Sequence, residues 1–183
     1  MPMRSNKSRR IAWMGLLFAL AIVLSFVESL ITPLLGLMPA VKLGLSNVVI
    51  MYALLFLPRR YAAALVVLKA LFAFLTRGAT AGFLSLAGGL LSFVVLSLLL
   101  CLPGTIGGYV FSACGALAHN LGQLAGAAVI LSSGAALAYA PILMIAGLIV
   151  GGITWMLLKA LLPYFEHISA GNATQVNAVK KLR

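Results

Sequence analysis

The stretch IAWMGLLFALAIVLSFVESLITPLL, residues 11–35, contains a single charged side chain, Glu28. An apolar run of about 20 residues is long enough to cross the hydrocarbon core of a bilayer as a helix. A carboxylate inside such a run costs a few kcal/mol to place, so it is rarely kept without a partner or a function. Residues 11–35 therefore predict a membrane-spanning helix, and Glu28 is predicted to have a task within it.

The rest of the chain has the same apolar character. Its 183 residues are 63% hydrophobic and 8% charged, with a mean hydropathy of +1.17. This balance is typical of a polytopic membrane protein and not of a soluble domain. Segments that span a bilayer must be helices or strands of a closed barrel, and these runs lack the apolar–polar alternation of barrel strands. We therefore predict an all-α integral membrane protein.

Proline, glycine and basic residues divide the chain into six predicted helices, which cover residues 11–35, 44–57, 61–75, 79–102, 107–131 and 136–162. Pro163 is expected to end the last helix. The second and third helices are shorter than the roughly 20 residues that a straight span needs, so a re-entrant hairpin is the alternative for this pair. Two spans are favoured, because Arg59 and Arg60 between them form a good cytoplasmic anchor.

The net charge of +11 comes mainly from basic clusters at both ends of the chain and at Arg59-Arg60. These are the positions at which cytoplasmic loops of membrane proteins carry Lys and Arg. We therefore predict a six-transmembrane-helix bundle with cytoplasmic N- and C-termini, and no nucleic acid as partner. The expected organisation is a basic N-terminus (1–10), a membrane domain (11–165) and a polar basic tail (166–183). Ala19 and Ala21 resemble a signal-peptidase motif but lie in the middle of the first apolar run, so we expect an uncleaved helix.

Polar side chains fall at the middle or outer level of several predicted helices. With a rise of about 1.5 Å per residue, Glu28 lies about 25 Å from the cytoplasmic entry of its helix, and Arg77 reaches a similar height. Polar groups scattered towards lipid would be costly, whereas one shared cavity is the cheaper arrangement. The predicted substrate-binding residues are Glu28, Lys42, Asn47, Arg77, Ser85, His119, Asn120 and Gln123, with Lys69 as a further candidate.

This set of side chains suits a small ligand with an anionic or carbonyl-rich part, because cations and neutral hydrogen-bonding groups dominate it. Structural alternatives exist for its members. Glu28 and Arg77 could neutralise each other, and Lys42 could reach to the membrane interface. Lys69 could likewise extend towards the cytoplasmic interface or pair with a carbonyl. The polar residues of the fifth helix could join helices through hydrogen bonds.

Small residues at a spacing of four let membrane helices approach each other closely. Gly122 with Gly126, and Gly147 with Gly151, are assigned to packing inside the bundle. Gly15 and Ala19 in the first helix are the predicted partner interface.

The scarcity of acidic residues excludes several classes of enzyme. The chain has no Asp and two Glu, so a carboxylate pair, an Asp-rich metal site or a Ser-His-Asp triad cannot be assembled. It also lacks the G-x-x-x-x-G-K-[ST] motif that binds nucleotide phosphates. We expect no catalytic residue, no metal site and no cofactor, and any ATP hydrolysis would come from another protein.

Three motifs carry a family resemblance, namely Lys42-Leu-Gly-Leu-Ser-Asn47, Gly82-Phe-Leu-Ser-Leu-Ala-Gly-Gly-Leu-Leu-Ser92 and Ala118-His-Asn-Leu-Gly-Gln123. In this order, between apolar helices, they resemble the bacterial membrane family labelled "Gx transporter" or "heptaprenyl diphosphate synthase component I". The resemblance covers about residues 10–160. Ser46 departs from the alanine expected in the first motif.

This family is similar to the S components of energy-coupling factor transporters. The resemblance implies six helices with both termini inside, and a pocket near the outer face that captures a vitamin or related micronutrient. It also implies a transmembrane coupling subunit and cytoplasmic ATPases as partners, and location as a multi-pass protein in the bacterial cytoplasmic (inner) membrane.

Two other functions stay open. One is a non-catalytic membrane subunit that serves a polyprenyl diphosphate synthase or a quinone or redox system. The other is a stand-alone ion- or proton-coupled transporter that uses Glu28 and His119. The synthase reaction itself is excluded for this chain alone, because diphosphates are held through Mg²⁺ by Asp-rich motifs.

Overall fold

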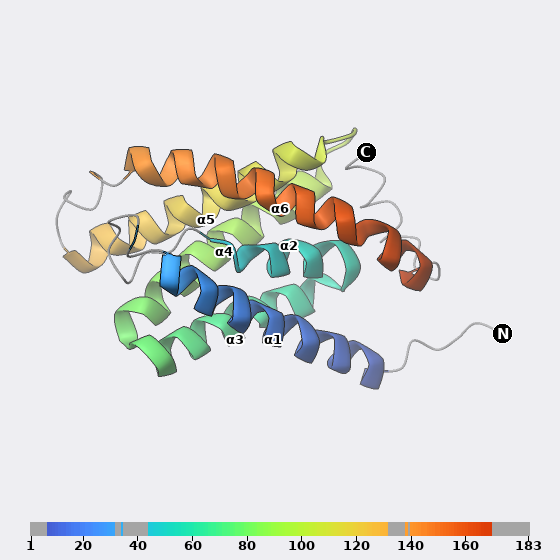
Figure 1. Cartoon of the computed structure of the whole chain (residues 1–183), viewed down its shortest axis with the longest axis horizontal. Helices are drawn as coiled ribbons and strands as arrows, with labels where there is room; N and C mark the ends of the chain where they lie inside the picture. Colours follow the sequence, from blue (N-terminus) through green and yellow to red (C-terminus); the bar gives the residue numbers. More distant parts are fainter. Residues whose placement is uncertain (1–6, 32–33, 35–43, 132–137, 139, 170–183) are drawn as a thin grey trace.

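A computed structural model describes residues 7–31, 34, 44–131, 138 and 140–169, with the backbone alone for 7–10 and 161–169. Lys42 lies outside the described residues. The described part folds into six helices and contains no strand, which confirms the all-α prediction (Figure 1). The helices are α1 (Lys7–Ile31), α2 (Asn47–Phe56), α3 (Arg59–Arg77), α4 (Ala79–Cys101), α5 (Gly108–Leu131) and α6 (Ala140–Ser169).

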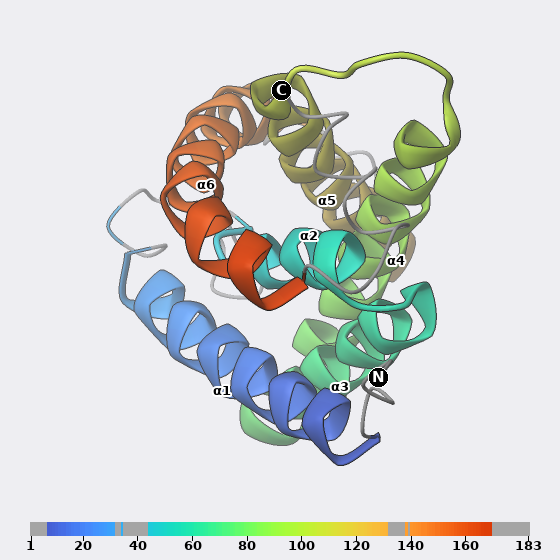
Figure 2. The same cartoon turned by 90° about the vertical axis from the view of Figure 1, so that its right-hand side faces the viewer.

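The short helix α2 lies at the centre of the bundle (Figure 2). All ten of its residues are buried, and it contacts each of the other five helices. At about 1.5 Å per residue it is about 15 Å long, half the thickness of a typical hydrocarbon core. Each surrounding helix packs a buried side chain into the same core cluster: Leu17 from α1, Leu65 from α3, Leu96 from α4, Phe111 from α5 and Leu158 from α6.

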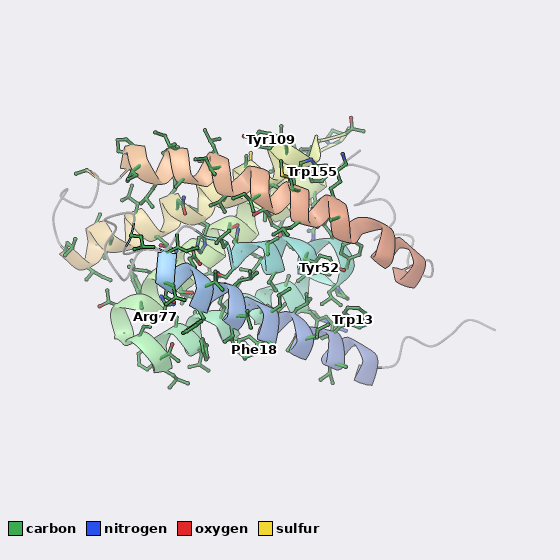
Figure 3. All side chains as sticks on the ribbon, in the orientation of Figure 1. Trp13, Phe18, Tyr52, Arg77, Tyr109 and Trp155 are labelled. Atoms are coloured by element: carbon green, nitrogen blue, oxygen red, sulfur yellow. The ribbon has the colours of Figure 1, made fainter. Side chains whose placement is uncertain are left out.

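The other helices surround α2 in the order α1, α3, α4, α5, α6, with extensive contacts between neighbours in that order. The start of α1 and the end of α6 lie at the same end of the bundle (Figure 1). Figure 3 places Arg77 towards the opposite end, whereas Trp13 and Trp155 lie towards the end where α1 starts. The predicted placement of both chain ends on one side is therefore consistent with the direction of these two helices.

Four helices have segments long and apolar enough to cross a membrane, and these are Ile11–Ile31, Ala79–Cys101, Gly108–Leu131 and Ala140–Ala160. Large apolar side chains such as Leu16, Phe26 and Ile149 are exposed on their outer faces, as expected against lipid. The remaining helices fall short of this description for different reasons. Helix α2 has only ten residues, and α3 contains four basic residues, Arg59, Arg60, Lys69 and Arg77.

Several helix ends differ from the predicted ends. Helix α1 begins at Lys7, within the predicted basic N-terminus, and α3 begins at Arg59, directly after Pro58. The expectation that Pro163 ends the last helix is wrong, because α6 continues to Ser169. A proline inside a helix removes one backbone hydrogen bond and bends the axis, but the turns on either side of it can persist.

The seams between α4, α5 and α6 depend on glycine. A Cβ on Gly122 would lie 2.6 Å from the Ala87 carbonyl oxygen, and one on Gly151 would lie 2.6 Å from the Ala113 Cα. Both are backbone atoms that cannot move aside. The two G-x-x-x-G motifs therefore serve internal packing, as predicted. Gly15 is different, because nothing lies within 4 Å of the position of its Cβ.

We predict that Gly122→Ala lowers the free energy of unfolding by about 1–3 kcal/mol, because the new methyl group overpacks the α4–α5 seam. Thermal unfolding of the detergent-solubilised protein would measure the change. Gly15→Ala is the matched control and should leave the stability unchanged or slightly raised, because its Cβ meets open space and alanine favours helix. Equal loss in both variants would contradict the assignment of Gly122 to the seam.

Candidate functional site

Lys69 and Ser46 meet inside the bundle because α2 and α3 form a hairpin. The two residues lie at nearly equal separations from Pro58, one before and one after the turn. Lys69 is buried with 6% of its surface exposed, and its Nζ donates a 3.1 Å hydrogen bond to Ser46 Oγ. Both lie about 15 Å from the Arg59 end of the hairpin, which is near the middle of a hydrocarbon core of about 30 Å.

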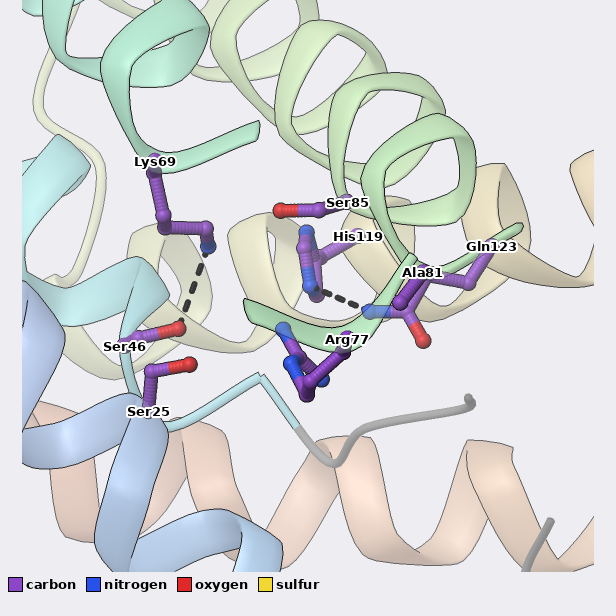
Figure 4. A pocket seen from close by; sticks show the side chains of 8 residues that line it. All are labelled: Ser25, Ser46, Lys69, Arg77, Ala81, Ser85, His119 and Gln123. Atoms are coloured by element: carbon purple, nitrogen blue, oxygen red, sulfur yellow. Dashed lines mark hydrogen bonds between the residues drawn. The ribbon is translucent and has the colours of Figure 1, made fainter. Parts of the chain in front are cut away.

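A small polar cavity adjoins this pair (Figure 4). It is lined by residues of α1, α3, α4 and α5 and by the residue before α2, namely Ser25, Ser46, Lys69, Arg77, Ala81, Ser85, His119 and Gln123. The centre of a water molecule can move within only about 10 Å³ of it, which is room for roughly one water. The side chains therefore nearly close the space that they share.

Two cations lie against this cavity, and both come from α3. Lys69 reaches it from the middle of the helix and Arg77 from the last residue. Arg77 is partly buried, and its Nη1 is a buried donor without a hydrogen-bond partner among the described residues. Buried donors rarely lack an acceptor, and no described residue supplies one to Arg77 Nη1.

Glu28 is fully buried beside the cavity but does not line it. Its Oε1 accepts hydrogen bonds from the backbone N–H groups of Gly44 and Leu45, at the entrance to α2. The carboxylate also interacts electrostatically with Lys69 and Arg77. Glu28 therefore joins the end of α1 to the start of α2 and supplies negative charge behind the two cations.

Gly44 makes this contact sterically possible. Its φ of 97° lies in the left-handed region, and a Cβ there would be 2.9 Å from the His119 ring. Glycine is the residue that tolerates both conditions. The imidazole of His119 is buried and forms a 2.7 Å hydrogen bond with Gln123 Nε2 across one turn of α5.

Asn47 belongs to a second polar group, deeper in the bundle. Its Nδ2 donates to Ser92 Oγ at 2.6 Å and to the Gly115 carbonyl at 3.2 Å, and Ser92 Oγ donates to the same carbonyl at 2.9 Å. These bonds join α2, α4 and α5. In the same way, Asn120 Nδ2 donates to the Leu143 carbonyl at 2.7 Å and joins α5 to α6.

The structure thus divides the predicted site residues into two groups. Five of them line the cavity: Lys69, Arg77, Ser85, His119 and Gln123. Three do not line it and instead bond to the backbone, in two cases that of other helices: Glu28, Asn47 and Asn120.

Sequence reasoning did not select Ser25 and Ser46 as site residues. Ser25 lies one helical turn before Glu28, so it shares the inner face of α1, and this spacing could have identified it. Ser46 directly precedes Asn47 and was noted only as a departure from the family motif.

The predicted partner residues Gly15 and Ala19 lie on the exposed face of α1, away from the cavity. Within the described ranges, no group of three or more His, Cys, Asp or Glu side chains comes together to hold a metal ion.

Four apolar spanning candidates define a multi-pass membrane protein, and three of them, α1, α4 and α5, line the polar cavity together with α3. The model of the family described as heptaprenyl diphosphate synthase component I matches residues 17–161, and the chain belongs to this family. The matched range contains every described cavity residue. No curated protein and no solved structure matches the chain significantly.

We predict that Asn47→Ala destabilises the protein by about 1–3 kcal/mol, because it removes two buried interhelical hydrogen bonds in the centre of the bundle. Unfolding in mixed micelles with increasing dodecyl sulfate would measure the loss. Thr76→Ala is the control, since Thr76 is exposed and bonds only to the Phe72 carbonyl of its own helix. A change within about 0.5 kcal/mol in both variants would show that the Asn47 group carries no stability.

Proposed function

We propose that the protein is a substrate-binding membrane protein that captures a small, micronutrient-like molecule in the cavity between α1, α3, α4 and α5. In this proposal it is an S-component-like six-helix protein of the bacterial cytoplasmic membrane, with both termini in the cytoplasm and with α2 too short to span the bilayer by itself. It performs no catalysis, and partner subunits power the transport.

The observation that carries the proposal is the convergence of polar side chains on one space. Four helices and the residue before α2 direct Ser, Lys, Arg, His and Gln groups to it, although only 8% of the chain is charged. Polar and charged groups inside a membrane are costly and usually mark a path or site for a solute. The hydrogen bonds of Asn47 and Asn120 already join the helices, so the cavity residues are not needed for that purpose alone.

The size of the cavity requires a movement on binding. Room for roughly one water cannot hold a molecule the size of a vitamin, so helices must separate when the ligand enters. Helix α1 is the best candidate to move. Only 22% of its spanning window is buried, and its extensive contacts are limited to α2 and α3. Glu28 and Ser25 lie on this helix, so its displacement would open the cavity wall.

The exposed face with Gly15 and Ala19 supports the assignment of partners. This face of α1 is open to contact with a transmembrane coupling subunit, which would approach closely at the small residues. The lack of a nucleotide-binding motif means that ATP hydrolysis is assigned to cytoplasmic ATPases. A partner bound to α1 could couple its own movement to the opening of the cavity.

The family description favours one alternative, a non-catalytic membrane subunit associated with a polyprenyl diphosphate synthase. Under this alternative the Asp-rich Mg²⁺ sites belong to a separate catalytic protein. Co-purification separates the two functions. Retention of a small molecule that depends on cavity residues supports the carrier, whereas stoichiometric capture of a prenyl synthase without such retention supports the subunit.

We predict that His119→Ala weakens retention of the co-purified small molecule about 10- to 100-fold, because it removes a hydrogen-bonding group from the cavity wall. Mass spectrometry of the released molecule, quantified per mole of protein, would measure retention. His167→Ala is the matched control, since His167 is the only other histidine and lies in the last turns of α6.

Ala81→Leu tests the cavity by volume alone. The larger side chain would fill the small space and should abolish retention while leaving every polar group in place. Its unfolding temperature would show whether the bundle stays folded. Full retention by folded Ala81→Leu and His119→Ala proteins would contradict the proposed site.

A further inference from the structure

We propose that the cavity binds a singly charged anionic group of its ligand, seated between Lys69 and Arg77. This inference rests on the proposed function and decides between the anionic and the merely carbonyl-rich ligand. The candidate groups are a carboxylate and a singly charged phosphate. Each carries one negative charge and has oxygen atoms that can accept hydrogen bonds from two donors at once.

The positive charges around the cavity outnumber the negative charges. Lys69 and Arg77 are two cations, and Glu28 is the one carboxylate that the described residues place near them. One positive charge is left without a counter-charge among the described residues, although Lys69 is buried and Arg77 is partly buried. Such a charge is costly unless it is paired and hydrogen-bonded.

The chain has no further acidic side chain that could supply a counter-charge at the cavity. It contains two acidic residues in all. The other one, Glu166, lies in the last turns of α6. Figure 1 shows that this end of α6 is opposite to the end of the bundle at which α1 finishes, and Glu28 lies in the last turn of α1. The missing negative charge at the cavity must therefore come from outside the side chains of this protein.

Neither cation has a charged hydrogen-bond acceptor among the described residues. Lys69 Nζ donates to Ser46 Oγ, which is a neutral acceptor. Arg77 Nη1 is buried and has no acceptor among the described residues. The C-terminal end of α3 favours a cation through the helix dipole, which offsets part of the cost of Arg77. The dipole supplies no acceptor to Nη1, which therefore still has none among the described residues.

Glu28 then acts as an internal counter-ion and not as a contact of the ligand. Its Oε1 is engaged by the N–H groups of Gly44 and Leu45, and the residue does not line the cavity. Its field neutralises one of the two cations. The site is thereby set for a ligand group with one negative charge, and an uncharged group would leave the second cation uncompensated.

The test uses the full chain in phosphatidylcholine nanodiscs, with ¹³C-labelled formate as the anionic probe and formamide as its uncharged counterpart. Saturation-transfer NMR would measure the binding of each. We expect formate to bind at least tenfold more tightly than formamide. Arg77→Gln and Lys69→Gln should each weaken formate binding roughly tenfold or more, because each removes a charged donor.

Arg59→Gln is the matched control. Arg59 is an exposed basic residue at the opposite end of α3, so its loss should leave formate binding unchanged. Arg77→Lys keeps the charge and should retain most of the binding. Glu28→Gln removes the internal counter-ion and should tighten formate binding, whereas a direct role as a ligand contact would weaken it.

A second arm identifies the source of the group. Displacement of formate by phosphatidylglycerol added to the discs would assign the site to a lipid head group, and formate binding that persists would assign it to a water-soluble ligand. Equal binding of formate and formamide, or equal effects of Arg77→Gln and Arg59→Gln, would overturn the inference. If a neutral molecule is then retained through His119, the carrier function stands and only the anionic assignment fails.

Discussion

The fold depends on how a half-length helix ends inside a bilayer. Helix α2 is only about 15 Å long, so its N-terminal N–H groups lie where no bulk water can satisfy them. The first two of these groups, on Asn47 and Val48, donate to the carbonyls of Gly44 and Leu45. Glu28 in turn accepts hydrogen bonds from the N–H groups of Gly44 and Leu45, which directly precede α2. A carboxylate is favoured there, because the N-terminus of a helix carries partial positive charge. The same contact joins the end of α1 to the start of α2, while Lys69 and Arg77 face the cavity.

The neighbouring helices accommodate this arrangement through backbone contacts. Gly88 and Gly122 let α4 and α5 approach until backbone touches backbone, and a Cβ on Gly88 would lie 2.8 Å from His119 Nδ1. The imidazole can lie beside the cavity only because α4 offers no side chain at that point. The tight packing of α4, α5 and α6 contrasts with the sparse burial of α1. The bundle thus combines a rigid half, which positions the polar groups, with one loosely held helix.

Much of the architecture was predictable, because apolar runs, helix breakers and basic clusters are local signals. The sequence predicted six helices and the convergence of Arg77, Ser85, His119 and Gln123. It could not reveal that the Asn47 and Asn120 side chains donate to backbone carbonyls of other helices. An asparagine in the sequence does not indicate whether its amide binds a solute or another helix. Nor could it place Lys69 opposite Ser46, because that pairing follows from how α2 packs against α3. The predicted end of the last helix at Pro163 was wrong, because a proline in the sequence does not show whether the helical turns on either side of it persist.

The buried half-helix has one more consequence. Below the cavity, the whole of α2 is a plug of interlocked apolar side chains, from Val48 to Phe56, which the five other helices surround. Rotation of a few side chains cannot open a continuous wet passage through such a plug. Under the proposed function, a solute held in the cavity would therefore find no passage through the bundle along α2. On the same proposal, the packed core around α2 would then keep the capture of a solute separate from the leakage of ions.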